Sequence, residues 1–161
     1  MTVKIGINGF GRIGRLALRV GWEQSGYDIV HINEPAGSSE QAAHLLEFDS
    51  VHGRWAIDIS PGPINLGIDG SFISYSMEEA PASVPWGDLG VDVVVDCSGK
   101  FRTPESLQPH FDQGAKKVVV SAPVKDPAAL NIVVGINDDL YEPSKHDLVT
   151  AASCTTNCLA P

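Results

Sequence analysis

The segment AASCTTNCLAP, residues 151–161, holds the residue whose chemistry is easiest to name, the cysteine at position 154. It follows the β-branched run DLVTA and precedes small hydroxylated residues, which indicates a turn from a strand into a helix. The field at a helix N-terminus favours the thiolate, which is the nucleophilic form of cysteine. Cys154 is therefore a candidate nucleophile, although a cysteine that only packs at a strand end gives the same local pattern.

A second candidate site lies near the N-terminus, where NGFGRIG places Gly9, Gly11 and Gly14 in the spacing G-x-G-x-x-G. In a dinucleotide site the first glycine permits a tight turn, the second lets the backbone approach a pyrophosphate, and the third allows helix and strand to pack closely. Glu34 follows Gly14 at the spacing of the carboxylate that binds the adenosine ribose. A carboxylate there repels a 2′-phosphate and favours NAD over NADP. The alternative is that Glu34 only caps a loop before Pro35.

The other half of such a site is expected where later strands end, within DCSGKF and VVVSAP. Ser98, Gly99 and Ser121 are the candidates, because ligands of open parallel sheets bind at the carboxyl ends of the strands. Each of these residue types also forms ordinary turns, so the local sequence leaves both roles open. The cysteines and histidines lack metal-ligand spacing, and we expect no metal site.

Alternating strands and helices are predicted between these candidates. Residues 3–8 and 28–33 are rich in β-branched side chains, and residues 11–24 between them have helical periodicity. A strand, a helix and a strand of these lengths form a parallel βαβ unit. A capping box at Ser38 starts the next helix. The first helix is expected to bury one face, composed of Ile13, Leu16, Ala17 and Val20.

The middle of the chain has a different pattern, in which short alternating runs are separated by turn residues. They occupy residues 55–60, 64–69 and 72–76. We expect a small antiparallel excursion there, followed by a return to parallel order around a helix that Thr103 caps. The later strands are expected at residues 91–97, 116–121, 131–135 and 147–151. The predicted fold class is α/β, a doubly wound and mainly parallel sheet of the Rossmann type.

Composition narrows the partners. The chain has 161 residues, with 20 acidic and 11 basic side chains and a net charge of -9. This balance argues against binding to nucleic acid or to an anionic membrane surface. The N-terminus lacks the pattern of a signal peptide, and no apolar run reaches the length of a membrane span. We expect a cytoplasmic protein whose partner is a small molecule.

The segments KIGINGFGRIGR, DSVHGR, PWGDLGVDVVVDCSG, KKVVVSAP and ASCTTNCLAP occur together along the chain. In this order and spacing they resemble the phosphorylating glyceraldehyde-3-phosphate dehydrogenase family, and the resemblance covers the whole chain. It implies that Cys154 is the nucleophile and that Ser153 and Thr155 contact the substrate. In that family the thiolate adds to an aldehyde, a hydride passes to NAD, and phosphate releases the product as an acyl phosphate.

The resemblance also carries over parts of the cofactor site. Arg12 and Ile13 match the positions whose backbone contacts the pyrophosphate, and Asn33 matches the residue before the ribose-binding acid. The family commonly has Asp where this chain has Glu34, and Glu79 stands where the family has a basic residue near the adenine. The segment HLLEFDSVHGRW resembles a branch found beside arsenic-resistance transporters, in which arsenate takes the place of phosphate.

The resemblance divides the chain into an NAD-binding domain, residues 1–150, and the start of a catalytic domain, residues 151–161. The remainder of that domain, with its general-base histidine and phosphate-binding residues, is expected beyond this chain. The complete enzyme is expected to be a homotetramer that acts on glyceraldehyde 3-phosphate with phosphate or arsenate, and the chain alone is expected to be inactive. The alternative function is a stand-alone NAD-binding or cysteine-based redox-sensing module.

Overall fold

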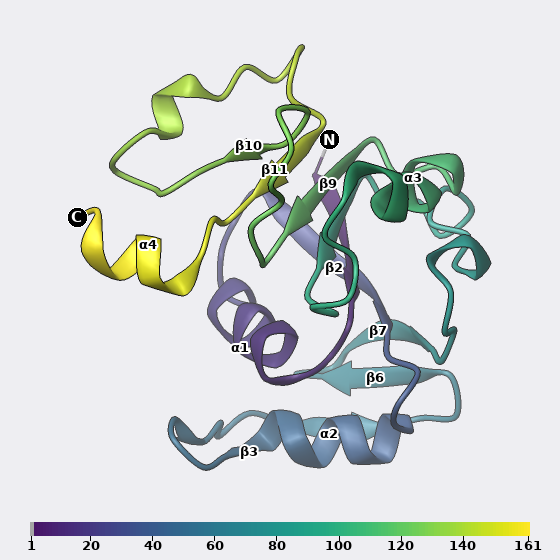
Figure 1. The fold of residues 1–161 in the computed structure, drawn as a ribbon. Coiled ribbons are helices and arrows are strands. Elements are labelled where there is room, and N and C mark those ends of the chain that lie inside the picture. Colours follow the sequence, from purple (N-terminus) through teal and green to yellow (C-terminus); the bar gives the residue numbers. More distant parts are fainter. Residues whose placement is uncertain (1) are drawn as a thin grey trace.

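The strand β1 (Val3–Asn8) lies near the middle of a nine-stranded sheet. The structure is a computed structural model that describes residues 2–161. The strands follow the order β10-β11-β9-β8-β1-β2-β7-β6-β5 across the sheet (Figure 1). The chain leaves β1 to one side through α1 (Arg12–Gly21) into β2 (Tyr27–Asn33), and the later half of the chain begins on the other side with β8 (Val93–Asp96). The switch in direction therefore lies between β1 and β8, where ligands of such sheets bind.

All neighbouring strands from the outer strand β10 through β1 to β7 pair in parallel. The remaining parallel strands are β7 (Ser71–Ser76), β9 (Lys117–Val120), β10 (Leu130–Asn131) and β11 (Leu148–Thr150). The antiparallel strands β5 (Ile59–Pro61) and β6 (Asn65–Ile68) extend the same sheet beyond β7. The predicted antiparallel excursion is thus part of the main sheet. A separate two-stranded sheet, which was not predicted, pairs β3 (Phe48–Asp49) with β4 (Gly53–Arg54).

Helices cover both faces of the sheet, as the doubly wound prediction requires. On one face α1 and α2 (Ser39–Glu47) pack over an apolar core that includes Ile7 and Ile32. On the other face α3 (Pro104–Asp112) packs over a second core around Val94 and Val118. The remaining helical segments are short: Pro81–Ser83, Asp138–Leu140 and α4 (Cys154–Leu159). The predicted α/β fold class is confirmed.

Helix starts were predicted more accurately than the face that α1 buries. The Ser38 and Thr103 side chains cap α2 and α3, and each takes part in a capping box. In α1 the predicted apolar face was wrong, since Ile13 is 54% exposed and Val20 74% exposed. A Cβ on Gly14 would collide with the carbonyl oxygen of Gly9, so glycine lets this face approach the sheet closely. The residues that α1 buries are Gly14, Leu18 and Gly21.

The parallel strands around β1 end in register. Asn8 of β1 pairs with Asn33 of β2 and with Asp96 of β8, and the row continues through Val120 of β9 to Thr150 of β11. The segments that follow these strands consequently emerge at one edge of the sheet. Within residues 2–161, no helix has the length and apolar character needed to cross a membrane.

Candidate functional site

The candidate residues gather at this common edge because each follows the end of a parallel strand. Gly9 follows β1 directly, Glu34 follows β2, and Ser98 comes two residues after the end of β8. Ser121 follows β9, and Cys154 comes four residues after the end of β11. The fold thus brings the two predicted halves of the cofactor site and the predicted nucleophile to the same side of the sheet.

The three glycines of the N-terminal turn have three different surroundings. Gly9 has a φ of +91°, and a Cβ there would lie 2.5 Å from the backbone nitrogen of Ser98. Gly14 packs against the carbonyl oxygen of Gly9. A Cβ on Gly11 would meet nothing within 4 Å, and Gly11 is the N-cap of α1. The first and third glycines are therefore required by the fold, whereas the second keeps open the space in front of the helix N-terminus.

Glu34 reaches from the end of β2 to the glycine turn. Its Oε2 accepts a hydrogen bond of 2.6 Å from the Phe10 N–H, and its Oε1 accepts one of 2.9 Å from the Ala36 N–H. It lines a cavity of about 170 Å³ between the ends of β1, β2 and β8. The loop-capping role and the ligand-binding position therefore occur in the same side chain. The other charged residues that line this cavity are Glu78, Glu79 and Lys100.

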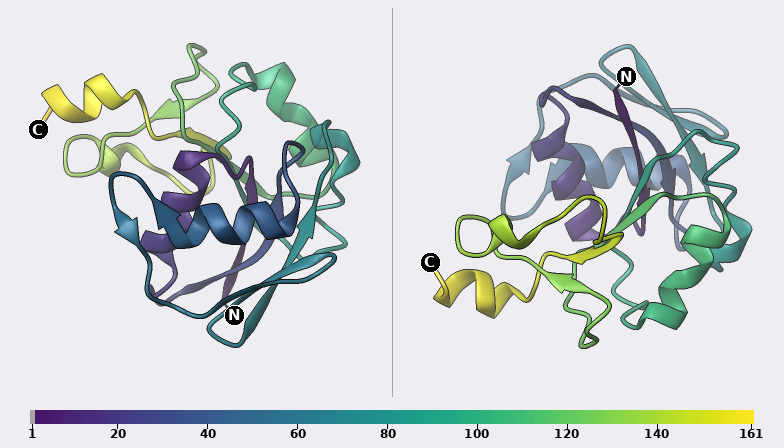
Figure 2. Two further views of the ribbon diagram at one scale, coloured as in Figure 1. Left: turned by 90° about the horizontal axis from the view of Figure 1, so that it is seen from below. Right: turned by 90° about the horizontal axis from the view of Figure 1, so that it is seen from above.

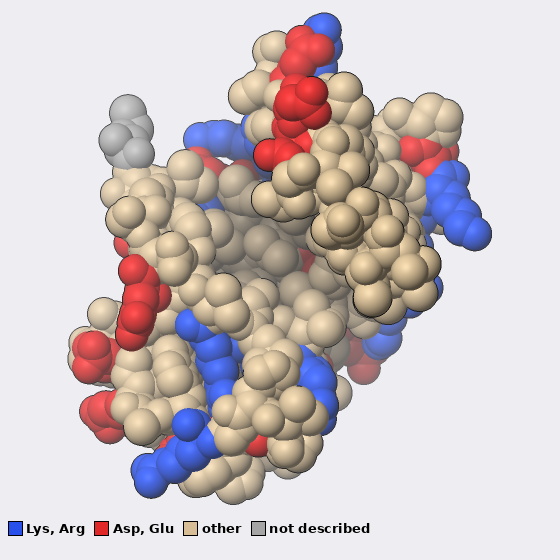
Figure 3. Space-filling view, turned by 90° about the vertical axis from the view of Figure 1, so that its left-hand side faces the viewer, with Lys and Arg blue, Asp and Glu red and all other residues tan. Residues whose placement is uncertain are grey.

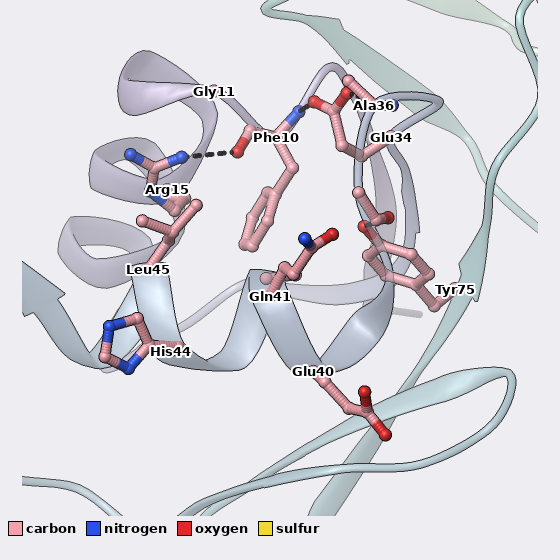
Figure 4. Close-up of a pocket in the computed structure, with 12 residues that line it drawn as sticks. Phe10, Gly11, Arg15, Glu34, Ala36, Glu40, Gln41, His44, Leu45 and Tyr75 are labelled. Carbon is pink, nitrogen blue, oxygen red and sulfur yellow. Dashed lines mark hydrogen bonds between the residues drawn. The ribbon is translucent and has the colours of Figure 1, made fainter.

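A larger cleft of about 740 Å³ lies between α1 and α2 on the other side of Glu34 (Figure 4). Phe10 and Leu45 line it, and the Nη1 of Arg15 donates a hydrogen bond of 3.0 Å to the Phe10 carbonyl. Burial lowers the pKa of the Arg15 guanidinium. Glu34 accepts from the Phe10 N–H while Arg15 donates to the Phe10 carbonyl, so the main chain of Phe10 is held on both sides.

Basic side chains gather near α1 although the chain carries a net charge of -9. Figure 3 looks onto the side where α1 and α4 lie in Figure 1, and Lys and Arg side chains appear together in its lower half. Arg12, Arg15 and Arg19 belong to α1. The Arg12 guanidinium lies 3.9 Å from the Asp49 carboxylate and its side chain is 51% exposed. Arg12 and Ile13 are thus placed with exposed side chains at the first turn of α1, where the backbone N–H groups face the open space at Gly11.

The second half of the site is built around the end of β8. The Ser98 hydroxyl donates a hydrogen bond of 2.7 Å to the Asp96 carboxylate, and Gly99 has a φ of +69°. The Ser121 N–H donates to the Asp96 carbonyl, which ties the end of β9 to that of β8. Burial raises the pKa of the neighbouring Cys97 thiol to about 11. This thiol is held in its neutral form, so Cys97 is the least suited of the three cysteines to act as a nucleophile.

The segment before Cys154 makes a tight turn that its own side chains hold. Ala152 has a φ of +55°, and its N–H donates a hydrogen bond of 3.0 Å to the Thr150 hydroxyl. The Ser153 hydroxyl caps α4 by accepting from the Thr156 N–H at 3.0 Å. The Asn157 side chain donates to the Ala151 and Ser153 carbonyls at 2.8 and 3.0 Å.

Cys154 is the first residue of α4 and is exposed, as is Thr155. In both views of Figure 2, α4 projects from the body of the molecule. The structure thus places Cys154 at the predicted turn from strand to helix and leaves its thiol accessible. The histidines are engaged elsewhere, in contacts of His31 with Ser74 and Ser76, His44 with Phe48, His52 with Asp49, His110 with Asp96 and Trp86, and His146 with the Glu142 backbone.

Residues 3–104 match the family described as "Glyceraldehyde 3-phosphate dehydrogenase, NAD binding domain". The chain belongs to this family. It is 59% identical over its whole length to glyceraldehyde-3-phosphate dehydrogenase 3 of Nostoc sp., and the match covers 48% of that relative. Identity is 49% to glyceraldehyde-3-phosphate dehydrogenase 1 of Kluyveromyces marxianus, over 99% of this chain and 47% of the relative. It is 44% to the Geobacillus stearothermophilus dehydrogenase, over 100% of this chain and 48% of the relative. The chain spans about half the length of these curated relatives.

The observed geometry fits the NAD that this dehydrogenase domain binds. The open space at Gly11 lies in front of the first turn of α1, where backbone N–H groups attract a pyrophosphate. Glu34 lines the neighbouring cavity, and its carboxylate accepts two backbone hydrogen bonds and keeps further acceptor capacity. Glu79 lines the same cavity and gives it a negative charge.

Sequence reasoning missed two residues in this dehydrogenase domain that lie under the predicted cofactor site. Asn8 is 4% exposed and Asp96 is fully buried, and a hydrogen bond of 2.8 Å joins their side chains. Asn33, which was predicted from the family, is 2% exposed and bonds to Asn8. A signal was present in the sequence, because β1, β2 and β8 each end in a polar residue that directly follows an apolar one.

Proposed function

We propose that the complete protein containing this chain is an NAD-dependent, phosphorylating glyceraldehyde-3-phosphate dehydrogenase. The observation that carries the proposal is the position of the glycine turn, Glu34 and the exposed Cys154 at one edge of the sheet. The proposed dinucleotide site follows β2, β1, β8 and β9, and the proposed nucleophile follows β11, which is the next strand beyond β9. The match over the whole chain to proteins named as this dehydrogenase supports the enzyme over a stand-alone redox-sensing module.

In this proposal the cofactor is held from both halves of the domain. The backbone around Gly9, Gly11 and Gly14, with Arg12 and Ile13, binds the pyrophosphate at the N-terminus of α1. Glu34 accepts hydrogen bonds from the adenosine ribose and disfavours a 2′-phosphate by charge repulsion. The segment after β8, with Ser98 and Gly99, and the end of β9 at Ser121 form the other half. Asn33, at the end of β2, completes this set.

Cys154 carries out the covalent step. Its thiolate sulfur forms a bond to the aldehyde carbon of the substrate, and Ser153 and Thr155 flank it as substrate contacts. When bound, NAD would supply the acceptor for a hydride from that carbon, and loss of the hydride would re-form the carbonyl and leave a thioester on Cys154. An oxygen of inorganic phosphate then attacks the thioester carbonyl and a general base takes the proton of the phosphate. The carbon–sulfur bond breaks, and the acyl phosphate leaves while the thiolate is restored.

The family resemblance also supports a division into domains, a cellular location, an oligomeric state and an acceptor. Residues 1–150 form the NAD-binding domain and residues 151–161 begin the catalytic domain, whose base and phosphate-binding residues lie beyond this chain. The complete enzyme acts in the cytoplasm as a homotetramer. The acceptor is phosphate or arsenate, and the segment around Asp49, which resembles the arsenic-associated branch, supports arsenate as the alternative.

The test is a steady-state assay of the complete protein with glyceraldehyde 3-phosphate and NAD, in which NADH formation is followed by absorbance. We expect sustained turnover that requires phosphate or arsenate, and a much lower rate when neither is added, because the thioester is then released only by water. A parallel assay uses residues 1–161 alone, for which we expect negligible turnover because general-base assistance contributes about 100- to 10,000-fold. Absence of NADH formation by the complete protein would refute the proposed activity.

A further inference from the structure

Beneath the cofactor site, a chain of buried side chains crosses three parallel strands. It links Asp96 at the end of β8, Asn8 at the end of β1 and Asn33 at the end of β2. These three residues are paired in the sheet register, and none is more than 4% exposed. We propose that Asp96 is a positioning residue for the adenosine end of the cofactor site, acting through Asn8 and Asn33 on the backbone of Glu78.

The direction of the chain follows from the carboxylate of Asp96, which accepts hydrogen bonds and donates none. Its Oδ1 accepts from the Ser98 N–H at 3.1 Å and from the Ser98 hydroxyl at 2.7 Å. Its Oδ2 accepts from Asn8 at 2.8 Å and contacts His110 Nε2 at 3.2 Å. The indole N–H of Trp86 donates to His110 Nδ1 at 3.0 Å, so a neutral His110 carries its proton on Nε2 and donates it to Asp96. Asp96 therefore has four donors around it.

Because Asp96 only accepts hydrogen bonds, it determines the orientation of the two amides that follow it in this series of hydrogen bonds, those of Asn8 and Asn33. Asn8 must turn its amide nitrogen toward Asp96, which leaves its oxygen facing Asn33. Asn33 must then present its nitrogen to Asn8, at 2.9 Å, and its oxygen to the opposite side. Buried amides whose partners are all specified in this way have one favourable orientation, since the reversed one places donor against donor.

At the far end, Asn33 holds the main chain of Glu78 by two hydrogen bonds. Its Oδ1 accepts from the Glu78 N–H at 2.8 Å, and its Nδ2 donates to the Glu78 carbonyl at 2.9 Å. The Ser76 hydroxyl also donates to that Oδ1, at 2.8 Å. Glu78 and Glu79 line the cavity of about 170 Å³ beside Glu34. The inference rests on the proposed use of this cavity for the adenosine half of NAD. It makes the position of the Glu78–Glu79 wall, which follows β7, depend on the carboxylate of Asp96 on β8, three strands away in the sheet.

Replacement of Asp96 by Asn keeps the shape of the side chain but puts a hydrogen-bond donor in the place of an acceptor, which reverses the orientation of the amides. The new amide nitrogen faces two donors, those of Asn8 and His110. Asn8 then turns its oxygen toward position 96, so that its nitrogen faces the nitrogen of Asn33. Asn33 turns in response and presents its nitrogen to the Glu78 N–H, and both bonds to the Glu78 backbone are lost. We expect the affinity for ADP-ribose to fall roughly tenfold, the effect of losing one or two hydrogen bonds that position a binding wall.

Two further variants separate positioning from a general loss of stability. His110→Leu removes one donor to Asp96 and leaves the Trp86 N–H without a partner, so it destabilises the same buried region while Asn8 and Asn33 keep their orientation. The double variant Asp96→Asn with Asn8→Asp restores an acceptor at position 8 for the Asn33 amide, but it leaves His110 facing an amide nitrogen. We expect both proteins to unfold at lower temperature than the wild type and to bind ADP-ribose with nearly wild-type affinity.

The experiment is calorimetric titration of the complete protein and its variants with ADP-ribose, with thermal unfolding of each recorded in parallel. Weak binding by Asp96→Asn, recovery in the double variant and wild-type binding by His110→Leu support the inference. Wild-type affinity in Asp96→Asn, or weak binding in proportion to lost stability across all variants, would overturn it. If Asp96→Asn does not fold, the double variant decides alone, since only wild-type affinity of the double variant for ADP-ribose agrees with the proposed positioning role of Asp96. A wild-type protein that does not bind ADP-ribose would instead refute the proposed cofactor site.

Discussion

The glycine turn and the Cys154 turn both follow parallel strands at the same edge of the sheet, but their surroundings differ. Around the glycine turn the polar groups have partners within the chain: Glu34 accepts from two backbone N–H groups, and the side chains beneath are buried and bonded to one another. Cys154 also has an ordered turn before it, held by Thr150 and Asn157. The thiol itself is exposed, however, and Leu159 at the end of α4 is 82% exposed.

This difference indicates which part of the function the chain supplies by itself. A preorganised turn with an open space at Gly11 binds a ligand without assistance, because its geometry is already set by the sheet. An exposed nucleophile lacks the water-excluding surroundings in which electrostatic stabilisation of a transition state is strong. NAD binding is the property that the family description gives to this chain. In the proposed function, acyl transfer requires further residues that cover Cys154.

The largest expected effect separates the two regions directly. Cys154→Ser in the complete protein should lower the rate of aldehyde oxidation at least roughly a thousandfold, because a serine hydroxyl is far less acidic than a thiol and does not form the thioester. The affinity for NAD should remain within about twofold, since Cys154 lies apart from the glycine turn. Steady-state kinetics and calorimetry measure the two quantities. The matched control is Cys158→Ser, one helical turn further along α4, which should retain activity. Substantial turnover by Cys154→Ser would assign the chemistry to another residue.

Within the glycine turn, two alanine substitutions should have opposite consequences. Gly14→Ala places a Cβ against the Gly9 carbonyl oxygen and should lower the free energy of unfolding by roughly 2–3 kcal/mol. Gly11→Ala meets open space and should cost less than about 1 kcal/mol, the effect of a poorer N-cap. The same Gly11→Ala should weaken NAD binding about tenfold, because its Cβ projects where the pyrophosphate approaches. Chemical unfolding and calorimetry test the pair, and equal stability losses would contradict this division of roles.

His31, which is buried in β2, should make the stability of the fold depend on pH. Burial lowers the pKa of His31 from 6.5 to about 4. Between these values the unfolded chain binds a proton that the folded chain does not, so stability is fully present above pH 6.5 and is lost as the pH falls toward 4. The loss is at most about 3 kcal/mol. Unfolding at a series of pH values should show this slope in the wild type and a smaller one in His31→Gln. His44→Gln, which changes an exposed histidine, should leave the slope intact.

The local elements were predictable because their signals are local. The capping box at Ser38, the helix cap at Thr103 and the glycine spacing each lie within a few residues, and the structure has all of them. The exposure of Ile13 and Val20 was not predictable by counting apolar side chains, since it depends on how closely α1 approaches the sheet. The continuation of the antiparallel strands in the main sheet likewise depends on a pairing between β2 and β7 that is distant in sequence.

The sequence predicted the residues at the surface of the candidate site but not the buried residues beneath it. Gly9, Glu34 and Cys154 are recognisable because each has a distinctive type and spacing, and the fold places all three at one edge of the sheet. Asn8 and Asp96 only end apolar strands, a position that many polar residues occupy. Their importance comes from the sheet register, which places them side by side, and the register depends on the pairing of strands separated by more than 80 residues.

The smallest expected effect concerns Glu34, which caps a loop and is also the proposed ribose-binding residue. Glu34→Gln keeps one acceptor oxygen and almost the same volume, so the hydrogen bond to Phe10 or to Ala36 survives and stability should change by less than about 1 kcal/mol. The loss of charge should weaken NAD binding roughly three- to tenfold while NADP binding weakens less, because the repulsion of a 2′-phosphate is removed together with the attraction for ribose hydroxyls. Glu40→Gln makes the same charge change in the neighbouring cleft and should leave the ratio of the two affinities unaltered. If Glu34→Gln lowers stability and leaves that ratio unchanged, Glu34 is a loop cap only, and the preference for NAD must arise elsewhere around the cavity.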